Sequence, residues 1–325
     1  MAAWWHRFVR VRGGPPPARP APPPVSPAVA AAVAAAVPRL DLDDPLDELA
    51  APPLLPWLLA LESVAEQADP TLQERRALRV VDALIQRPEA PLELIPRART
   101  VIPHLLALLR RPDCALPALA EQVGRDLVLT AEVMRAARSA ALGASGGPPP
   151  DLQQALARLG VAGLNAAIAR VVLRPMFESE GDGLFARSGP RLWEHAEAKA
   201  QHCRALAAAG GVDAFDAYLA GLMHNSGWTV ALRALDRSGL FDEPPPAVSP
   251  RLSAAFSRAL QPRCDALFGR VAASWQVTPS LTAVATSAAA PGGLAASDLP
   301  LAALLRRADA LASRMVAGSP AAGAA

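Results

Sequence analysis

The stretch Tyr218-Leu-Ala-Gly-Leu-Met-His-Asn-Ser-Gly-Trp228 decides the fold, because it joins an apolar segment to a histidine and an amide. Its large apolar residues recur at positions i, i+1, i+4 and i+5 from Tyr218, which predicts a buried helix leading into His224. Side chains at such a helix end either bind a ligand or form hydrogen bonds with other polar groups in the core. In a catalytic metal site we expect His-Asp here, whereas Asn225 offers only a neutral carbonyl oxygen.

The composition favours helices over sheets. The chain has 325 residues, which is enough for a core domain with extensions. Hydrophobic residues make up 52% of it, mostly Ala and Leu, whereas aromatic residues make up only 4%. This balance is typical of helices that pack closely through small side chains. Since no segment alternates with period two, the sequence predicts an all-α protein.

Charge and cysteine content exclude several classes of function. The 32 basic and 30 acidic residues leave a net charge of +2, so nothing electrostatic points to a nucleic-acid partner. Nearly all the basic residues are arginine, and Lys199 is the only lysine. We interpret this preference as a compositional bias of the source genome and not as evidence of a phosphate site. Cys114, Cys203 and Cys264 form no CxxC pair, which argues against a disulfide framework or a thiolate zinc site. No continuous apolar run approaches the roughly 20 residues that span a bilayer, and we expect a cytoplasmic protein.

Proline-rich and helical stretches divide the chain. The predicted parts are a disordered Pro/Ala-rich tail (1–38), a helical extension (39–90), a main helical domain (91–317) and a disordered C-terminal tail (318–325). The first tail carries Trp4, Trp5 and Phe8 among basic residues, a composition suited to weak contact with a membrane surface. The alternative is a disordered tail with incidental aromatic residues.

Caps and periodicity predict individual helices. They are a helix starting at Asp44-Pro45, one from Pro56 through Val64, one capped by Thr71, and then Ile95–Leu109, Leu116–Val123, Val128–Ala137, one from Asp151 to Gly160, Leu164–Leu173, Arg187–Gly210, Ala214–Met223, Leu252–Leu260, Arg263–Trp275 and Pro300–Met315. Within Arg187–Gly210, His195, Lys199 and His202 share one stripe of the helix.

Six segments in a fixed order resemble one family. They are Asp126–Ala140, where Arg138 replaces an expected Asn; Asp151–Gly160; Leu192-Trp-Glu-His-Ala196; Ala220-Gly-Leu-Met-His-Asn-Ser-Gly227; Trp275-Gln-Val-Thr-Pro279; and Arg307-Ala-Asp-Ala-Leu-Ala312. Together they are similar to the HDOD family, bacterial all-helical domains related to HD phosphohydrolases, over roughly residues 90 to 315. The resemblance implies a multi-helix HD-like domain.

The resemblance also implies where a metal would bind. In metal-dependent HD enzymes the ligands are a first His, the His-Asp pair and a final Asp, which correspond here to His195, His224, Asn225 and Asp309. Asn225 breaks the pair, and a histidine-rich stretch that often follows Trp-x-x-Pro is replaced by Ala285–Ala290. A metal at such a site would lose a negative ligand and would acidify its water less. The resemblance therefore implies a degenerate site with no catalytic residue.

Two interpretations of these four positions stay open. They form an inert polar core, in which His224 and Asn225 cap their helix and Asp309 pairs with Arg306 or Arg307, or they bind a metal weakly without turnover. For function, the resemblance implies a non-catalytic signal-transduction module that binds a protein partner or a small signal and needs no cofactor. The alternative is a metal-dependent phosphohydrolase acting on a nucleotide or cyclic dinucleotide.

Overall fold

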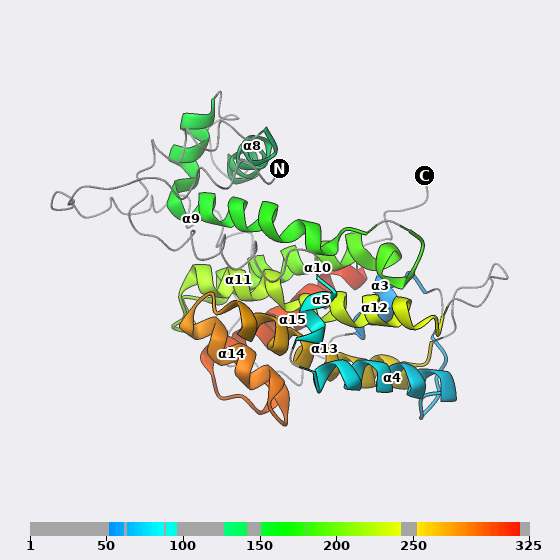
Figure 1. The fold of residues 1–325 in the computed structure, drawn as a ribbon. Coiled ribbons are helices and arrows are strands. Elements are labelled where there is room, and N and C mark those ends of the chain that lie inside the picture. Colours follow the sequence, from blue (N-terminus) through cyan, green and yellow to red (C-terminus); the bar gives the residue numbers. More distant parts are fainter. Residues whose placement is uncertain are drawn as a thin grey trace.

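The predicted all-α class is confirmed. The computed structural model describes residues 52–61, 64–87, 89–95, 127–141, 151–179, 181–241 and 252–318. These residues form helices joined by loops, and no strand occurs among them (Figure 1). The one isolated β-bridge in the described part of the chain joins Ala65 to Ser253.

The helices follow in chain order, with the labels of Figure 1. They are α3 (Leu54–Leu58), α4 (Leu72–Ile85), α5 (Ala90–Glu93), α8 (Leu127–Ala141), α9 (Leu152–Leu173), the 3-10 turn η2 (Arg174–Phe177), α10 (Leu184–Leu206), α11 (Ala214–His224), α12 (Ser226–Ser238), α13 (Ala254–Trp275), α14 (Pro279–Ala289), the turn η3 (Gly293–Ala296) and α15 (Pro300–Gly318).

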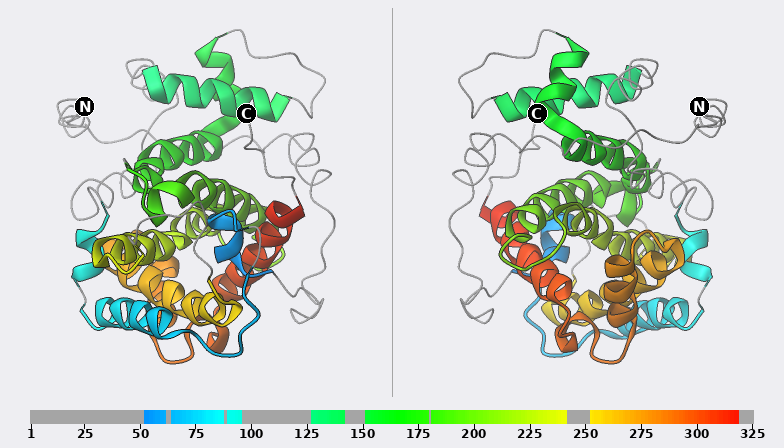
Figure 2. Two further views of the ribbon diagram at one scale, coloured as in Figure 1. Left: turned by 90° about the vertical axis from the view of Figure 1, so that its right-hand side faces the viewer. Right: turned by 90° about the vertical axis from the view of Figure 1, so that its left-hand side faces the viewer.

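The body of the fold is a bundle of α10, α11, α12, α13 and α15. Helix α10 packs against α11, α12 and α15, and α13 packs against α12 and α14. Helix α8 and the start of α9 lie at one end of the molecule, and α4 and α14 lie at the other (Figures 1 and 2). The centre of this bundle holds α11, in which every residue from Asp216 to His224 is buried.

Helix α9 connects the α8 end to the bundle. The segment Gln154–Phe177 is long enough to cross a membrane, and an 18-residue stretch within it has a mean hydropathy of 1.6. It packs against α8 and α11, however, and Gly160 interrupts its helical geometry with a φ of +63°. Arg170, near its end, forms ion pairs with Glu132 of α8 and Glu197 of α10. The second half of α9, from Leu164 to Leu173, is largely buried and belongs to the protein core, whereas Val161 in its first half is exposed.

Several sequence predictions are confirmed and others are wrong in extent. Thr71 and Asp151 cap their helices as predicted. The helix predicted from Pro56 through Val64 is wrong, because α3 ends at Leu58 and Ala60 adopts a φ of +52°. The two helices predicted on either side of Pro262 are one continuous helix, α13. Helices α12 and α14 were not anticipated.

Some predictions lie outside the described residues. They are the N-terminal tail with Trp4, Trp5 and Phe8, the helix start at Asp44, and the helices Ile95–Leu109 and Leu116–Val123.

Glu74 fixes α4 against the start of α13. The Thr71 hydroxyl accepts a hydrogen bond from the Glu74 amide, and the Glu74 carboxylate accepts one from the Thr71 amide at 2.7 Å. The same carboxylate accepts hydrogen bonds from the Ser253 amide at 2.6 Å and the Ser253 hydroxyl at 2.8 Å. One buried side chain therefore caps two helices that are far apart in the sequence.

We expect Glu74→Ala to lower the free energy of unfolding by about 2–3 kcal/mol, because it leaves the buried Ser253 amide without its acceptor. Chemical denaturation monitored by circular dichroism measures the change. Glu66→Ala is the matched control, since Glu66 is exposed, and should change the value by less than about 0.5 kcal/mol. Equal effects of the two substitutions would contradict this role.

Candidate functional site

The four residues that the sequence singled out lie together in the core. His195 is on α10, His224 ends α11, Asn225 forms the junction between α11 and α12, and Asp309 is on α15. His195 and Asn225 are fully buried, and His224 is 4% exposed. Asp309 retains 22% of its side-chain exposure, although its Oδ1 atom is buried. Three separate points of the chain thus meet at one polar cluster.

Lys199 occupies the middle of this cluster. It lies one turn after His195 on α10 and is fully buried. Its Nζ atom lies 2.7 Å from His224 Nδ1, 2.8 Å from Asn225 Oδ1 and 2.5 Å from Asp309 Oδ1. The contact with Asp309 is a close ion pair and lacks hydrogen-bond alignment. An ammonium group has three donors, and here three acceptors surround it.

The Asn225 amide fits its neighbours in a way that a carboxylate would not. Its Oδ1 atom accepts from Lys199, and its Nδ2 group donates to the Leu192 carbonyl oxygen at 2.8 Å. Nδ2 also lies 3.2 Å from His195 Nδ1. With the orientation and the surrounding groups of the wild type unchanged, an aspartate here would place an oxygen against the Leu192 carbonyl and the lone pair of His195. The arrangement therefore requires both the donor and the acceptor of an amide.

His224 links the cluster to α13. Its Nε2 atom lies 3.2 Å from Asp265 Oδ1, and its ring meets Phe268 edge-on with centroids 5.0 Å apart. Burial and Lys199 act to lower the pKa of His224, but the neighbouring carboxylates of Asp265 and Asp309 outweigh them and raise it. Because His224 Nδ1 and Lys199 Nζ are within hydrogen-bonding distance, one of them must supply a lone pair. The pair therefore carries a single positive charge, which we assign to Lys199 because an alkylammonium is a far weaker acid than an imidazolium.

Asp309 is held as a carboxylate. Burial acts to raise the pKa of its carboxyl group, but Lys199 and His224 overcome this effect and hold the pKa well below its usual value. Sequence analysis offered Arg306 or Arg307 as the partner of Asp309. The ion-pair partner that the structure gives it is Lys199, from a different helix.

His195 is a neutral member of the cluster. Burial and the neighbouring Lys199 lower the pKa of its imidazole from 6.5 to about 3. Since the Asn225 amide faces Nδ1, the proton resides on Nε2, which donates to the Ser313 hydroxyl at 3.0 Å. His195 therefore hydrogen-bonds a neighbouring helix, α15.

Stability should fall on acidification because of His195. The unfolded chain takes up a proton here below pH 6.5, whereas the native state does not until about pH 3. The contribution is therefore complete above pH 6.5 and is lost at up to about 1.4 kcal/mol per pH unit as the pH falls. In a His195→Asn variant, denaturation at pH 7, 6 and 5 should show a shallower loss, by about 2 kcal/mol over this range. Parallel curves for both proteins would contradict the assignment.

The N-terminal extension covers the cluster. Trp57 of α3 packs near the His195 ring, with centroids 6.5 Å apart, and Arg191 of α10 lies over the Trp57 ring at 5.9 Å. Helix α3 contacts α10, α13 and α15 and buries Leu55 and Leu58 fully or almost fully. Access to His195 from this side is therefore closed.

The donor set does not fit a divalent metal. Among the described residues, no group of three or more His, Cys, Asp or Glu side chains is placed to hold one. The space between His224, Asn225 and Asp309 contains the Lys199 ammonium, whose positive charge would repel a metal ion. Asn225 also contributes no charge. No hydrolytic step through a metal can be derived from this arrangement.

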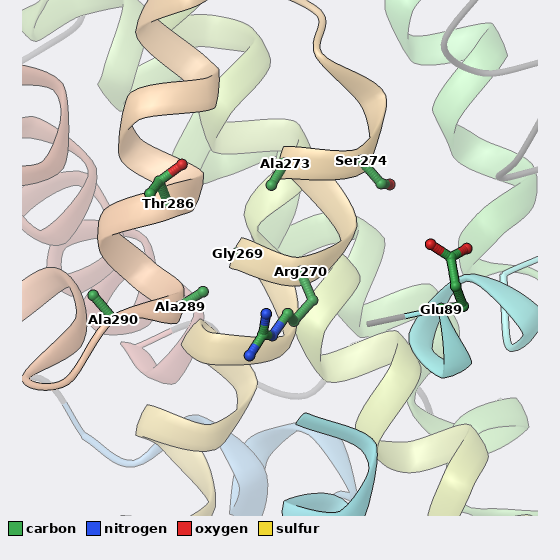
Figure 3. Close-up of a pocket in the computed structure, with 8 residues that line it drawn as sticks. All are labelled: Glu89, Gly269, Arg270, Ala273, Ser274, Thr286, Ala289 and Ala290. Atoms are coloured by element: carbon green, nitrogen blue, oxygen red, sulfur yellow. The ribbon is translucent and has the colours of Figure 1, made fainter. Parts of the chain in front are cut away.

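A surface pocket lies elsewhere, between α13 and α14 (Figure 3). It encloses about 410 Å³ and is lined by Glu89, Gly269, Arg270, Ala273, Ser274, Thr286, Ala289 and Ala290. None of the clustered residues lines it. A β-carbon at Gly269 would lie 2.5 Å from the Ala285 carbonyl oxygen, so this glycine allows close packing of the two helices. We therefore retain the buried cluster as the candidate site.

Sequence analysis missed three members of the cluster, namely Lys199, Asp265 and Ser313. Lys199 had a visible signal, because it is the only lysine in 325 residues and follows His195 by one helical turn. Asp265 and Ser313 had none, since their positions beside His224 and His195 follow only from how α13 and α15 pack.

A helical bundle around His195, His224 and Asp309 defines the class as an HD-like all-α domain. The sequence pattern of the HDOD domain matches residues 95–291, so the chain belongs to the HDOD domain family. The predicted resemblance is confirmed.

A solved structure shares this fold, and a second is more distantly similar. An HDOD domain protein with unknown function from Geobacter sulfurreducens is similar with a TM-score of 0.52 and 20% identity, over 72% of this chain and 77% of that one. A protein from Shewanella amazonensis named "Putative metal-dependent phosphohydrolase" is similar with a TM-score of 0.49 and 20% identity, over 66% and 75%. At 20% identity, the likeness to the Geobacter sulfurreducens protein shows the fold alone. No curated protein matches the chain.

Proposed function

We propose that this chain is a non-catalytic HDOD-type signal-transduction module that acts in the bacterial cytoplasm and binds a protein partner or a small signal. The single observation that carries the proposal is the position of the Lys199 ammonium among His224, Asn225 and Asp309. Metal-dependent hydrolysis requires a metal-bound water as nucleophile, and the lysine leaves no place for either.

Two further features support a binding role. Trp57 and the buried leucines of α3 cover the His195 side of the cluster, which opposes access of a substrate. The Asn225 amide satisfies Leu192, so position 225 serves the internal structure of the domain. A domain that keeps the buried polar cluster but lacks metal-dependent hydrolysis is suited to present a surface to a partner.

A hydrolysis assay tests the proposal that the protein is non-catalytic. We expect the wild-type protein, supplied with Mn²⁺, Mg²⁺ or Zn²⁺, to cleave bis-p-nitrophenyl phosphate and cyclic dinucleotides no faster than a His224→Ala variant. His202→Ala, on the same helix as His195 but outside the cluster, is the control for non-specific damage. Metal-dependent turnover that persists in His202→Ala and disappears in His224→Ala would support the phosphohydrolase alternative and overturn the proposal.

The proposal that the protein binds a partner is tested by isolating a defined complex. Affinity capture from the source cell should identify a protein that forms a stoichiometric complex when both components are purified. Because no metal takes part, we expect the affinity of this complex to be the same with and without EDTA. A complex that dissociates on chelation and re-forms on adding a divalent metal would contradict the proposal.

A further inference from the structure

We propose that the Lys199 ammonium group is a built-in cation that takes the place of a divalent metal, and that Lys199 and Asn225 form a matched pair. Replacing both, with alanine at 199 and aspartate at 225, should expose a latent metal-binding site. This inference goes beyond the proposed function, because it concerns what holds the centre of the domain together.

The candidate ligand atoms around the ammonium lie slightly farther apart than the ligands of one metal would. His224 Nδ1 lies 3.7 Å from Asp309 Oδ1, and His195 Nε2 lies 3.9 Å from the same oxygen. Ligand atoms bound to one metal at about 2.0–2.2 Å lie roughly 3–3.5 Å from each other. Shifts of a few tenths of an ångström would bring each of the two nitrogens to that spacing from Asp309 Oδ1.

The charges of the two arrangements balance in the same way. A divalent cation with carboxylates at 225 and 309 would sum to zero. Lys199 with Asn225 and Asp309 also sums to zero, because one positive charge faces one carboxylate. Restoring the carboxylate alone would leave an excess negative charge beside the lysine, and removing the lysine alone would leave Asp309 unbalanced. Since buried charges are tolerated when paired, the two positions depend on each other.

Lys199 also links the helices that a metal bound at this position would link. From α10 it reaches the end of α11 through His224, the start of α12 through Asn225, and α15 through Asp309. One side chain thus joins four helices of the bundle. Unlike a metal, it cannot be lost to a chelator.

Metal binding by a set of variants tests the inference. After dialysis against Zn²⁺ or Mn²⁺ and then metal-free buffer, we expect Lys199→Ala/Asn225→Asp to retain about one metal per chain, binding at least 100-fold more tightly than wild type by calorimetric titration. Its thermal midpoint should rise with metal concentration. The same double variant carrying His224→Ala is the matched control and should lose both effects.

Three results would overturn the inference. They are stoichiometric metal binding by the wild type, equally tight binding by Asn225→Asp alone, and binding by the double variant that is no tighter than that of the His224→Ala control. The absence of hydrolysis would stand in the third case, so this failure is distinct from that of the proposed function.

The wild-type protein provides a test that does not depend on the folding of a variant. Because Lys199 is the only lysine, an amine-specific acylating reagent reports on one side chain. We expect Lys199 to react at least 100-fold more slowly in the native protein than in the chain unfolded in guanidinium chloride, by peptide mass spectrometry. Similar rates in the two states would show a freely accessible lysine and overturn the inference.

Discussion

Replacing Lys199 with methionine should lower the free energy of unfolding by about 3–5 kcal/mol, one of the two largest effects we expect in this protein. Methionine fills a similar volume but supplies no charge and no donor. The substitution would leave the Asp309 carboxylate, His224 Nδ1 and Asn225 Oδ1 facing an apolar group in the core. A buried charge that loses its partner is far more costly than the net contribution of the pair.

Denaturant unfolding monitored by circular dichroism measures the effect of Lys199→Met. Arg258→Ala is the control, because Arg258 is an exposed cation on α13, and it should change stability by less than about 0.5 kcal/mol. Asp309→Asn in the Lys199→Met background should restore part of the loss, since it removes the unpaired charge. Additive effects of the two substitutions, or a loss below about 1 kcal/mol for Lys199→Met, would contradict the central position of the lysine.

Replacing Gly227 with alanine is the second substitution with a large expected effect. Gly227 lies in the first turn of α12, where α12 packs on α13. A β-carbon at this position would lie 1.8 Å from the Cys264 carbonyl oxygen and 2.9 Å from the Phe268 amide nitrogen. Both are backbone atoms, so relief requires the helices to separate. We expect a loss of about 3 kcal/mol or more, the upper range for overpacked cores.

Gly210→Ala is the matched control for Gly227→Ala. Its nearest contact would be 3.3 Å from a methyl carbon of the Leu304 side chain, which can move. Its expected cost is below about 1 kcal/mol. Both variants are compared by thermal and denaturant unfolding. The packing argument fails if Gly227→Ala unfolds with the same midpoint as Gly210→Ala. Movement of α12 would also displace Asn225, so the Gly227 variant should expose Lys199 to acylation.

Local signals made much of the fold predictable from the sequence. The Thr71 and Asp151 caps and the break at Gly160 depend only on neighbours within a helical turn. The position of His224 at the end of a buried helix followed from the apolar spacing before it. The assembly of His195, His224, Asn225 and Asp309 followed from the resemblance, because separate segments of the chain matched one family in order.

Other features depend on contacts between distant segments. Helix α13 continues through Pro262, although a proline there made a break the better prediction. The role of Asn225 became clear only from its bonds to Leu192 and Lys199, which lie 33 and 26 residues away in the sequence. The periodicity placed Lys199 on the same stripe as His195, but it gave no indication that Asp309 of α15 would meet it.

Nuclear magnetic resonance of the single lysine tests the central claim most directly. With lysine labelled selectively with ¹⁵N, the wild-type protein should give one side-chain ammonium signal. Its protons should exchange slowly with water, and its position should not change on addition of Zn²⁺ or Mg²⁺. This result would show that the buried ammonium occupies the metal position. A rapidly exchanging signal like that of a solvated lysine, or displacement of the signal by a stoichiometric amount of metal, would contradict the account.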